Sequence, residues 1–364
     1  YMNLSTLKTQ TPIFDRYLAA NLVSATLTVL FVLLAIFSFF AFIEEMEEIG
    51  KGNYTIFKAA HVVFFKIPGL IYKLLPISAL IGSLLGLGSM TERGEIAVVR
   101  CAGVSKAGVL KSVLKVALYF VLATALVGDL IYPQAQQRAE SLRSIALDGK
   151  TDKAGLTGFW ALDRGSYVNI GTVLPDEIRG VRIYKFDTEQ NLQMALFARR
   201  GYFQGGKWKL HDIEKTIFSE GKILTQKKEN EIWDSTLAPD LIVMSALEPA
   251  SLKTLALLRY ISFAEDNGLD SHHWETGFWS KISGPLATGA MVFLALPLAL
   301  KNISNRASSG RRILFGAFVG LGFYMFNQTA AHIGVVLGVP SYVTALGPIF
   351  LLAVSGVLLY HRVP

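Results

Sequence analysis

Long stretches without a charged residue limit what this chain can fold into. Five of them cover residues 17–43, 74–91, 282–300, 313–331 and 333–360. A helix needs about 20 predominantly apolar residues to cross the hydrocarbon core of a bilayer, and each stretch is close to or beyond that length. A sixth stretch, 116–132, is weaker because Asp129 interrupts it. The sequence therefore predicts six membrane-spanning helices, and its content of 52% hydrophobic and 17% charged residues agrees with a membrane protein.

The distribution of Lys and Arg predicts how these helices are oriented. Basic residues are concentrated in the short segments 92–115 and 301–312. Because short loops rich in Lys and Arg stay in the cytoplasm, both segments are predicted to be cytoplasmic. Alternation then places the acidic loop 44–52 and the large region 133–274 on the other side, with both termini in the cytoplasm. The net charge of +7 reflects this topology and does not indicate a nucleic-acid partner.

The region between the third and fourth predicted helices has a different pattern. Short pieces rich in β-branched and aromatic residues, such as SYVNIG, VRIYKF and LQMALFA, are separated by turns that contain Gly, Pro or Asp. Many short strands at this spacing predict an all-β sandwich or barrel. Apolar residues at helical spacing in 250–267, followed by Gly268, predict a helix that leads back to the membrane.

The predicted chain has three parts, with three membrane helices on each side of the β-domain. The N-terminal half, 1–140, contains helices at about 17–43, 68–91 and 108–132 and a short cytoplasmic helix at about 94–103. The β-domain with its connecting helix covers 141–268. The C-terminal half, 269–364, contains helices at about 278–300, 313–333 and 341–360.

The charged segment TERGEIAVVRCAGVS, residues 91–105, lies between the second and third predicted spans. Gly94 and Gly103 are suited to break and to end a helix of about two turns. On a helical repeat, one face of it carries an acid beside small apolar residues: Glu95, Val98, Val99 and Ala102. Such a face suits docking in a cytoplasmic partner that offers a cation. The alternative is an amphipathic connector on the inner membrane surface, and the pattern alone leaves both open.

A small-residue motif in the second span predicts close helix packing. Gly82 and Gly86 are four residues apart, and this spacing lets two helices approach closely in lipid. The motif serves either packing within the chain or contact with another subunit.

Two arginines follow the third span. Arg138 and Arg143 are predicted to lie near the outer face of the membrane, where they suit the phosphates of an anionic lipid. A solvated helix end is the alternative. An acidic cluster on the same side would repel such phosphates unless divalent ions or a partner's basic residues intervene; it comprises Glu44, Glu45, Glu47 and Glu48.

The sequence predicts no catalytic, nucleotide or metal site. It contains no phosphate-binding loop of the form G-x-x-x-x-G-K-[ST] and no dinucleotide fingerprint, so any ATP must be used by another subunit. Adjacent His272 and His273 lack metal-site spacing, and Cys101 is the single cysteine. No set of nucleophile, base and orienting residue is recognisable.

Four motifs together resemble a known family. They are FDRYL at 14–18, LLGLGSMTERGEIAVVRCAGVS at 84–105, WSKI at 279–282 and GVPS at 338–341. With them the chain resembles the lipopolysaccharide export permeases (the YjgP/YjgQ family) over nearly its whole length, and the motif at 84–105 is the most specific.

This resemblance implies a particular assembly. It implies a β-domain of jellyroll type in the periplasm, and a position in the bacterial inner membrane. The partners would be LptF as the second permease chain, two copies of the ATPase LptB, and LptC with LptA beyond it. Lipopolysaccharide would be the substrate. The chain itself would bind no cofactor, whereas the partner ATPase would use ATP and Mg.

The resemblance also implies roles for particular residues. The segment around 94–103 would be the helix that couples to the ATPase, through Glu92, Arg93, Glu95, Val98, Val99 and Ala102. Arg143 and Arg138 would contact lipid phosphates, although Glu140, Glu47 and Glu48 stand where some relatives have basic residues. The lipid cavity and its lateral gate would be lined from the first and fifth spans by Leu34, Phe37, Phe40, Glu44, Phe315, Phe318, Leu321 and Phe323. Ordinary lipid-facing side chains are the alternative for these last positions.

Two functions are therefore compared. The first is the membrane half of an ATP-driven lipid extractor. The second is a non-transporting envelope receptor or assembly factor, whose β-domain binds an envelope partner and whose cytoplasmic loop only signals.

Overall fold

The computed structural model describes most of the chain. The described residues are 4–148, 157–173, 177–187, 191–204, 206–219, 222–235, 237, 239, 242, 249–266, 271–301 and 309–362. The chain divides into two compact units. A helical unit comprises Tyr1–Glu47, Ala59–Ala139 and Glu275–Pro364, and a β unit comprises Glu48–Lys58 and Glu140–Trp274.

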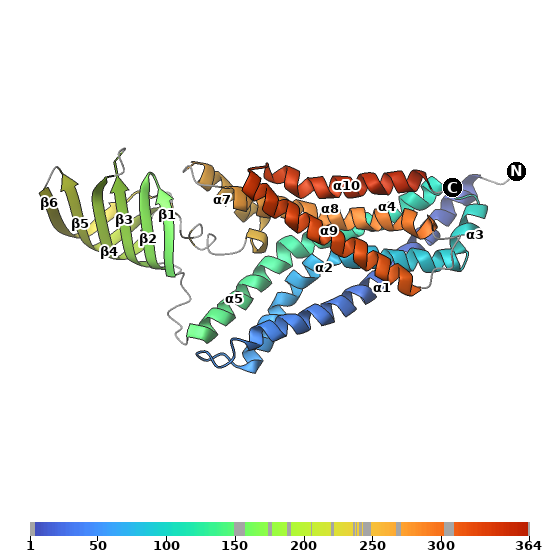
Figure 1. Cartoon of the computed structure of the whole chain (residues 1–364), viewed down its shortest axis with the longest axis horizontal. Coiled ribbons are helices and arrows are strands. Elements are labelled where there is room, and N and C mark those ends of the chain that lie inside the picture. The colour runs from blue at the N-terminus through green and yellow to red at the C-terminus, as the bar shows by residue number, and fades with distance from the viewer. Residues whose placement is uncertain are drawn as a thin grey trace. The chain divides into compact units, whose positions relative to one another are not determined.

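Helices long and apolar enough to span a bilayer account for most of the helical unit. The described residues contain six such segments, Ile13–Met46, Ile56–Glu92, Lys106–Leu147, His272–Leu300, Ile313–Gly334 and Ser341–His361. The helices that contain them are α1 (Leu4–Met46), α2 (Ile56–Glu92), α4 (Lys106–Leu126), α5 (Tyr132–Asp148), α8 (His272–Lys301), α9 (Ser309–Leu337) and α10 (Ser341–His361) (Figure 1). The prediction of six apolar helices is confirmed.

The third span continues further than the sequence pattern predicted. After α4 the chain forms a π-helical turn, η1 (Val127–Ile131), and passes directly into α5, which ends at Asp148. Pro133 has no backbone N–H, and the helix continues past it through this π-helical turn, where the carbonyl of Gly128, five residues earlier, accepts a hydrogen bond from Lys281 Nζ. The segment that follows is rich in Ala, Gln, Glu and Arg, which favour helix. The helix therefore runs beyond the predicted end at 132.

The glycine motif of the second span packs within this chain. A methyl group added at Gly82 would lie 2.4 Å from the Cα of Thr26, and one added at Gly86 would lie 3.0 Å from Leu22, so α1 crosses α2 at close range. Along α1 the buried residues recur every four positions, at Leu18, Leu22, Thr26 and Leu30. Both glycines therefore serve packing of α1 on α2, the first of the two predicted uses.

The cytoplasmic candidates lie at one end of the helical unit. Figure 1 shows the start of α1, the short helix α3 (Glu95–Cys101) and the end of α10 at the same end. The Lys106 ammonium at the start of α4 lies 4.7 Å from the centre of the Tyr360 ring near the end of α10. The two ends of the described chain therefore lie together with α3.

The β unit contains one antiparallel sheet. Its strands are β1 (Thr157–Asp163), β2 (Ser166–Val173), β3 (Glu177–Phe186), β4 (Leu192–Gln204), β5 (Lys207–Ser219) and β6 (Lys222–Trp233), and each pairs with the next in sequence. Strand β5 has the sequence KWKLHDIEKTIFS and is one continuous strand. Helix α7 (Thr254–Asp266) forms where the sequence predicted the connecting helix. The all-β prediction is confirmed as a six-stranded sheet, and jellyroll closure stays a prediction.

Strands β3 and β5 each change the side that faces the core at one residue. Gly180 in β3 and Asp212 in β5 have positive φ angles of 65° and 54°. On either side of them the buried residues are three positions apart, Ile178 and Val181 in β3, and Leu210 and Ile213 in β5. Because side chains alternate with a period of two, this spacing means that each strand rotates its core side at the positive-φ residue. The sheet is therefore bent across these strands.

The apolar face of the sheet is covered by the chain itself. Its buried core includes Val168, Ile170, Val181, Ile183, Leu196, Trp208, Leu210 and Ile213. Leu237 and Ile242, which follow β6, and Phe263 of α7 complete this core. The indole Nε1 of Trp208 donates a hydrogen bond of 2.6 Å to the carbonyl of Leu237. In this state the inner face is packed.

Candidate functional site

Two glycines with positive φ set the bounds of α3. Gly94 precedes the helix at φ 73°, and Gly103 follows it at φ 99°. A side chain at these angles would be strained, so the sharp turns on either side of α3 depend on glycine. The predicted break and stop are confirmed, and they detach α3 from α2 and α4 as a separate two-turn element.

Helix α3 presents apolar surface to solvent. Ile96 is buried and fixes the helix to the bundle, whereas Val98 is 68% exposed and Ala102 is also exposed. Val99 is half-buried. Val98 and Ala102 are four residues apart, so they form a small exposed apolar strip on one face of α3. The face predicted from the sequence is thus only partly outward.

The carboxylate of Glu95 is held by two donors within this chain. Arg93 Nε lies 2.6 Å from Glu95 Oε1, and the hydroxyl of Tyr17 donates to the same oxygen at 3.2 Å. The other oxygen, Oε2, is buried and has no hydrogen-bond partner among the described residues. The structure thus brings the predicted Arg93 and Glu95 together and adds Tyr17, which the sequence pattern did not reveal. Glu92 is exposed beside them.

Arg143 is paired with one of the predicted acids in the β unit. Its Nη2 lies 3.1 Å from Glu48 Oε1, and Lys51 Nζ lies 2.8 Å from Glu48 Oε2. The hydrogen bond from Lys51 lowers the pKa of the Glu48 carboxyl, and the charge of Arg143 lowers it further, so Glu48 is an anion at neutral pH. The predicted repulsion of phosphates by Glu48 is therefore offset by two cations, and 42% of the Arg143 side chain remains exposed.

The rest of the acidic cluster lies in the helical unit. Glu45 is buried and its Oε1 lies 2.5 Å from Lys66 Nζ, while Glu44 and Glu47 are exposed. The positive charge of Lys66 compensates the negative charge of the buried Glu45. Within the described ranges, no group of three or more His, Cys, Asp or Glu side chains is arranged to hold a metal ion. Arg138 is exposed on α5.

The two helices predicted to line the lateral gate are the least covered by the chain. In the most apolar window of α1 and of α9, 11% of residues are buried, against 61% in α2 and in α8. The predicted gate residues are mostly exposed: Phe37 and Phe40 on α1, and Phe315, Phe318 and Leu321 on α9. Leu34 is half-buried, and Phe323 packs against the bundle core. The exposed faces of α1 and α9 are apolar surfaces suited to contact with lipid or with another chain.

A buried cation lies inside the helical unit. Lys281 of α8 is 9% exposed, and its Nζ donates a hydrogen bond of 2.7 Å to the carbonyl of Gly128 in η1. The charge of Asp129, next to that glycine, acts on the Lys281 ammonium. The Tyr72 hydroxyl donates to the carbonyl of Ser280 at 3.2 Å. A lysine in an apolar span is costly unless it is paired, so this contact holds α8 to the third span.

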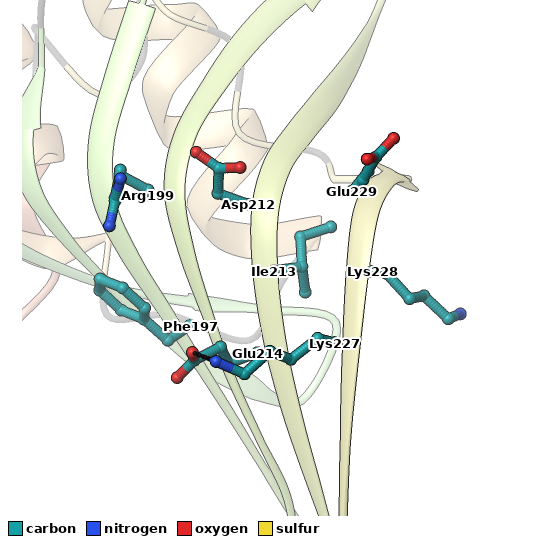
Figure 2. Close-up of a pocket in the computed structure, with 8 residues that line it drawn as sticks. All are labelled: Phe197, Arg199, Asp212, Ile213, Glu214, Lys227, Lys228 and Glu229. Carbon is teal, nitrogen blue, oxygen red and sulfur yellow. Dashed lines mark ion pairs between the residues drawn. The ribbon is translucent and has the colours of Figure 1, made fainter.

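A groove on the β unit has a balanced charge. It has a volume of about 540 Å³ and is lined from β4, β5 and β6, as Figure 2 shows, by Phe197, Arg199, Asp212, Ile213, Glu214, Lys227, Lys228 and Glu229. Lys227 Nζ lies 2.6 Å from Glu214 Oε1, and Lys228 Nζ lies 3.0 Å from Glu231. Because its lysines are paired with acids, this groove does not offer the cationic surface that a phosphate group requires.

The described residues contain six helices that are long and apolar enough to span a membrane, together with a separate antiparallel sheet, which is the architecture of a multi-pass membrane protein with an additional β-domain. Comparison with known proteins names the class more closely. Residues 16–362 match the family described as lipopolysaccharide export system permease LptF/LptG. The chain therefore belongs to this family, and the resemblance noted in the sequence is confirmed.

Two relatives carry the name lipopolysaccharide export system permease protein LptG. The protein of Haemophilus influenzae is 32% identical over 343 residues, which are 93% of this chain and 96% of the relative. The protein of Escherichia coli K12 is 28% identical over 340 residues, which are 92% and 94% of the two chains. The family consists of permeases, so this chain is a non-catalytic permease subunit of the inner membrane and the receptor alternative is not supported.

Proposed function

We propose that this chain extracts lipopolysaccharide from the inner membrane as one permease subunit of an ABC-type exporter and passes it toward the outer membrane. The observation that carries this proposal is the exposed helix α3, whose acid is held in place and whose Val98 lies outward. A permease that has no nucleotide site of its own needs an exposed helix such as α3 to couple its movement to ATP hydrolysis in a partner subunit. Family membership supports lipopolysaccharide as the cargo.

The partners follow from this proposal. LptF is the second permease chain and covers the exposed faces of α1 and α9. Two copies of LptB hydrolyse ATP with Mg, and α3 docks on one of them through Glu92, Arg93, Glu95, Val98, Val99 and Ala102. LptC and, through it, LptA receive the lipid. The chain itself holds no cofactor.

The topology of the proposed exporter is three spans, the β-domain and three further spans. The end of the helical unit that carries α3 and both chain ends is cytoplasmic, which agrees with the basic segments 92–115 and 301–312. The β unit then lies in the periplasm, where its sheet forms part of a jellyroll. Lipid enters at a lateral gate on the helical unit, lined by Leu34, Phe37, Phe40, Glu44, Phe315, Phe318, Leu321 and Phe323.

Reconstitution tests this proposal directly. The chain, purified in mild detergent from its native membrane, is expected to bring a second permease chain and an ATPase in fixed proportion. In liposomes this complex should release lipopolysaccharide to an acceptor only when ATP is hydrolysed. A chain that is recovered alone and releases no lipid would contradict the exporter and favour the receptor alternative.

Arg143 is proposed to bind lipid phosphate, with Arg138 beside it in sequence, and Arg143→Ala is the test. A charge-assisted hydrogen bond contributes about 1.5–3 kcal/mol, so its loss should weaken lipopolysaccharide binding by roughly 10- to 100-fold. Binding to the purified complex can be followed by photocrosslinking of the lipid.

Glu48→Gln is the matched control because it breaks the same ion pair from the other side. If Arg143 binds phosphate, Glu48→Gln retains or increases lipid binding, since it removes a competing anion. If Arg143 only braces the β unit through Glu48, both variants should lower lipid binding equally, and that outcome would refute the phosphate role.

A further inference from the structure

The cytoplasmic start of α1 touches the acid of α3. The Tyr17 hydroxyl and Glu95 are 78 positions apart in sequence and form the 3.2 Å hydrogen bond described above. Arg93 reaches the same oxygen, but it lies in the turn between α2 and α3. Of these two donors, only Tyr17 joins the carboxylate to another helix. The orientation of Glu95 therefore depends on where α1 stands.

Further contacts fix this end of α1 to the bundle. Asp15 accepts a hydrogen bond from the hydroxyl of Ser112, and its Oδ2 lies 2.5 Å from Lys115 Nζ, both on α4. Leu18 and Leu22 are fully buried. The first turns of α1 in the helical unit are thus attached to α2, α3 and α4 together, so a displacement of α3 also acts on α1.

The outer part of α1 is built differently. Beyond Leu30, which is buried, the helix exposes Phe31, Phe37 and Phe40 to 73%, 45% and 61%. From Ile13 to Met46 the helix contains neither Pro nor Gly, the usual sites of a kink. Near the outer end of α1, Glu45 is paired with Lys66 of α2, so the uncovered stretch lies between Leu30 and Glu45. A helix without a kink transmits a tilt of its inner part to that stretch.

We propose that Tyr17 is a positioning residue that connects the ATPase-docking acid Glu95 to the gate helix α1. This inference rests on the proposed function, in which α3 docks on the partner ATPase. Arg93 holds the Glu95 carboxylate from the turn before α3, and Tyr17 makes the movement of that acid a movement of α1. Loss of the Tyr17 hydroxyl leaves docking and hydrolysis in place and separates hydrolysis from lipid release.

The test compares two quantities in the reconstituted complex of Tyr17→Phe, the rate of ATP hydrolysis and the amount of lipopolysaccharide released per ATP. Hydrolysis is expected to stay within about twofold of wild type, whereas release per ATP falls roughly tenfold, the effect of one hydrogen bond to a charged group. An unchanged release per ATP would overturn the inference. Thermal unfolding of the variant in detergent checks that the bundle is intact.

Two matched variants separate a link from general support of Glu95. Tyr119→Phe removes a hydroxyl from a tyrosine of α4 that is 69% exposed, and it should change neither quantity. Arg93→Gln removes the shorter contact to the same oxygen without touching α1, so it should lower docking and hydrolysis more than release per ATP. If Arg93→Gln and Tyr17→Phe lower the release per ATP equally, Tyr17 only supports the Glu95 carboxylate and does not connect it to α1.

The wild-type and Glu95→Arg complexes distinguish the two possible failures. If wild type releases lipid with ATP, Glu95→Arg does not, and Tyr17→Phe behaves as wild type, the inference on Tyr17 fails alone. If wild type releases no lipid, or Glu95→Arg releases it normally, the proposed function fails.

Discussion

Reversing the charge of Glu95 is expected to abolish ATP-dependent release of lipopolysaccharide while the chain still inserts and folds. In Glu95→Arg the new guanidinium lies next to Arg93. It would also repel the cation of the partner ATPase that the Glu95 carboxylate is proposed to contact. Losing one member of a hydrogen-bonded charge pair at an interface costs about 2–5 kcal/mol or more, which weakens docking by roughly 30-fold or more. Co-purification of the ATPase and lipid release should both be lost.

Arg100→Glu is the control for this prediction. It reverses an exposed charge on the same helix without touching the Tyr17, Arg93 and Glu95 cluster, so release should remain close to wild type. A strain depleted of the natural protein gives a second measurement. Full growth of that strain on the Glu95→Arg chain would show that α3 does not couple through this acid.

Truncating Lys281 is expected to destabilise the helical unit more than any single surface change. In Lys281→Ala the carbonyl of Gly128 loses the hydrogen bond from the Lys281 ammonium, and the buried Lys281 side chain no longer joins α8 to η1. A hydrogen bond to a charged group contributes about 1.5–3 kcal/mol, whereas a surface substitution usually changes stability by about 0.5 kcal/mol or less. The thermal midpoint of the purified chain in detergent, followed by size-exclusion chromatography, should fall sharply.

Lys73→Ala provides the matched control, since Lys73 is an exposed lysine of α2 and its truncation should leave the midpoint nearly unchanged. Lys281→Arg keeps the positive charge and should lose less stability than Lys281→Ala. If all three variants unfold at the wild-type temperature, Lys281 does not hold α8 to the third span.

Local features of the sequence were sufficient for the elements themselves. Hydropathy over about 20 residues predicted the six apolar helices, because a span needs that length whatever surrounds it. Gly94 and Gly103 predicted the ends of α3, because only glycine adopts their φ angles without strain. Alternation of short strands and turns predicted the all-β region. The long extension of the third span was missed, because a polar helix that leaves the membrane has no hydropathy signal.

Glu95 as the proposed docking acid was also predicted from the sequence, through the motif at 84–105 and its resemblance to the permease family. The contacts that orient the Glu95 carboxylate were not predicted from the sequence. Tyr17 begins an apolar run, and nothing in the sequence indicates that its hydroxyl donates a hydrogen bond to Glu95 of α3. The pairs of Lys66 with Glu45 and of Arg143 with Glu48 were hidden likewise, and the acidic cluster was interpreted as repulsive without its cations.

The sequence by itself determined which helices are long and apolar enough to cross a membrane, where α3 begins and ends, and that the insert contains strands. Only the tertiary structure decided that Gly82 packs on Thr26, that Lys281 reaches Gly128 and that the inner face of the sheet is filled by Leu237. The physical reason is the sequence separation between the interacting residues. Hydropathy and turn conformation depend on neighbouring residues, whereas a partner 78 or 153 positions away depends on which helix faces pack together.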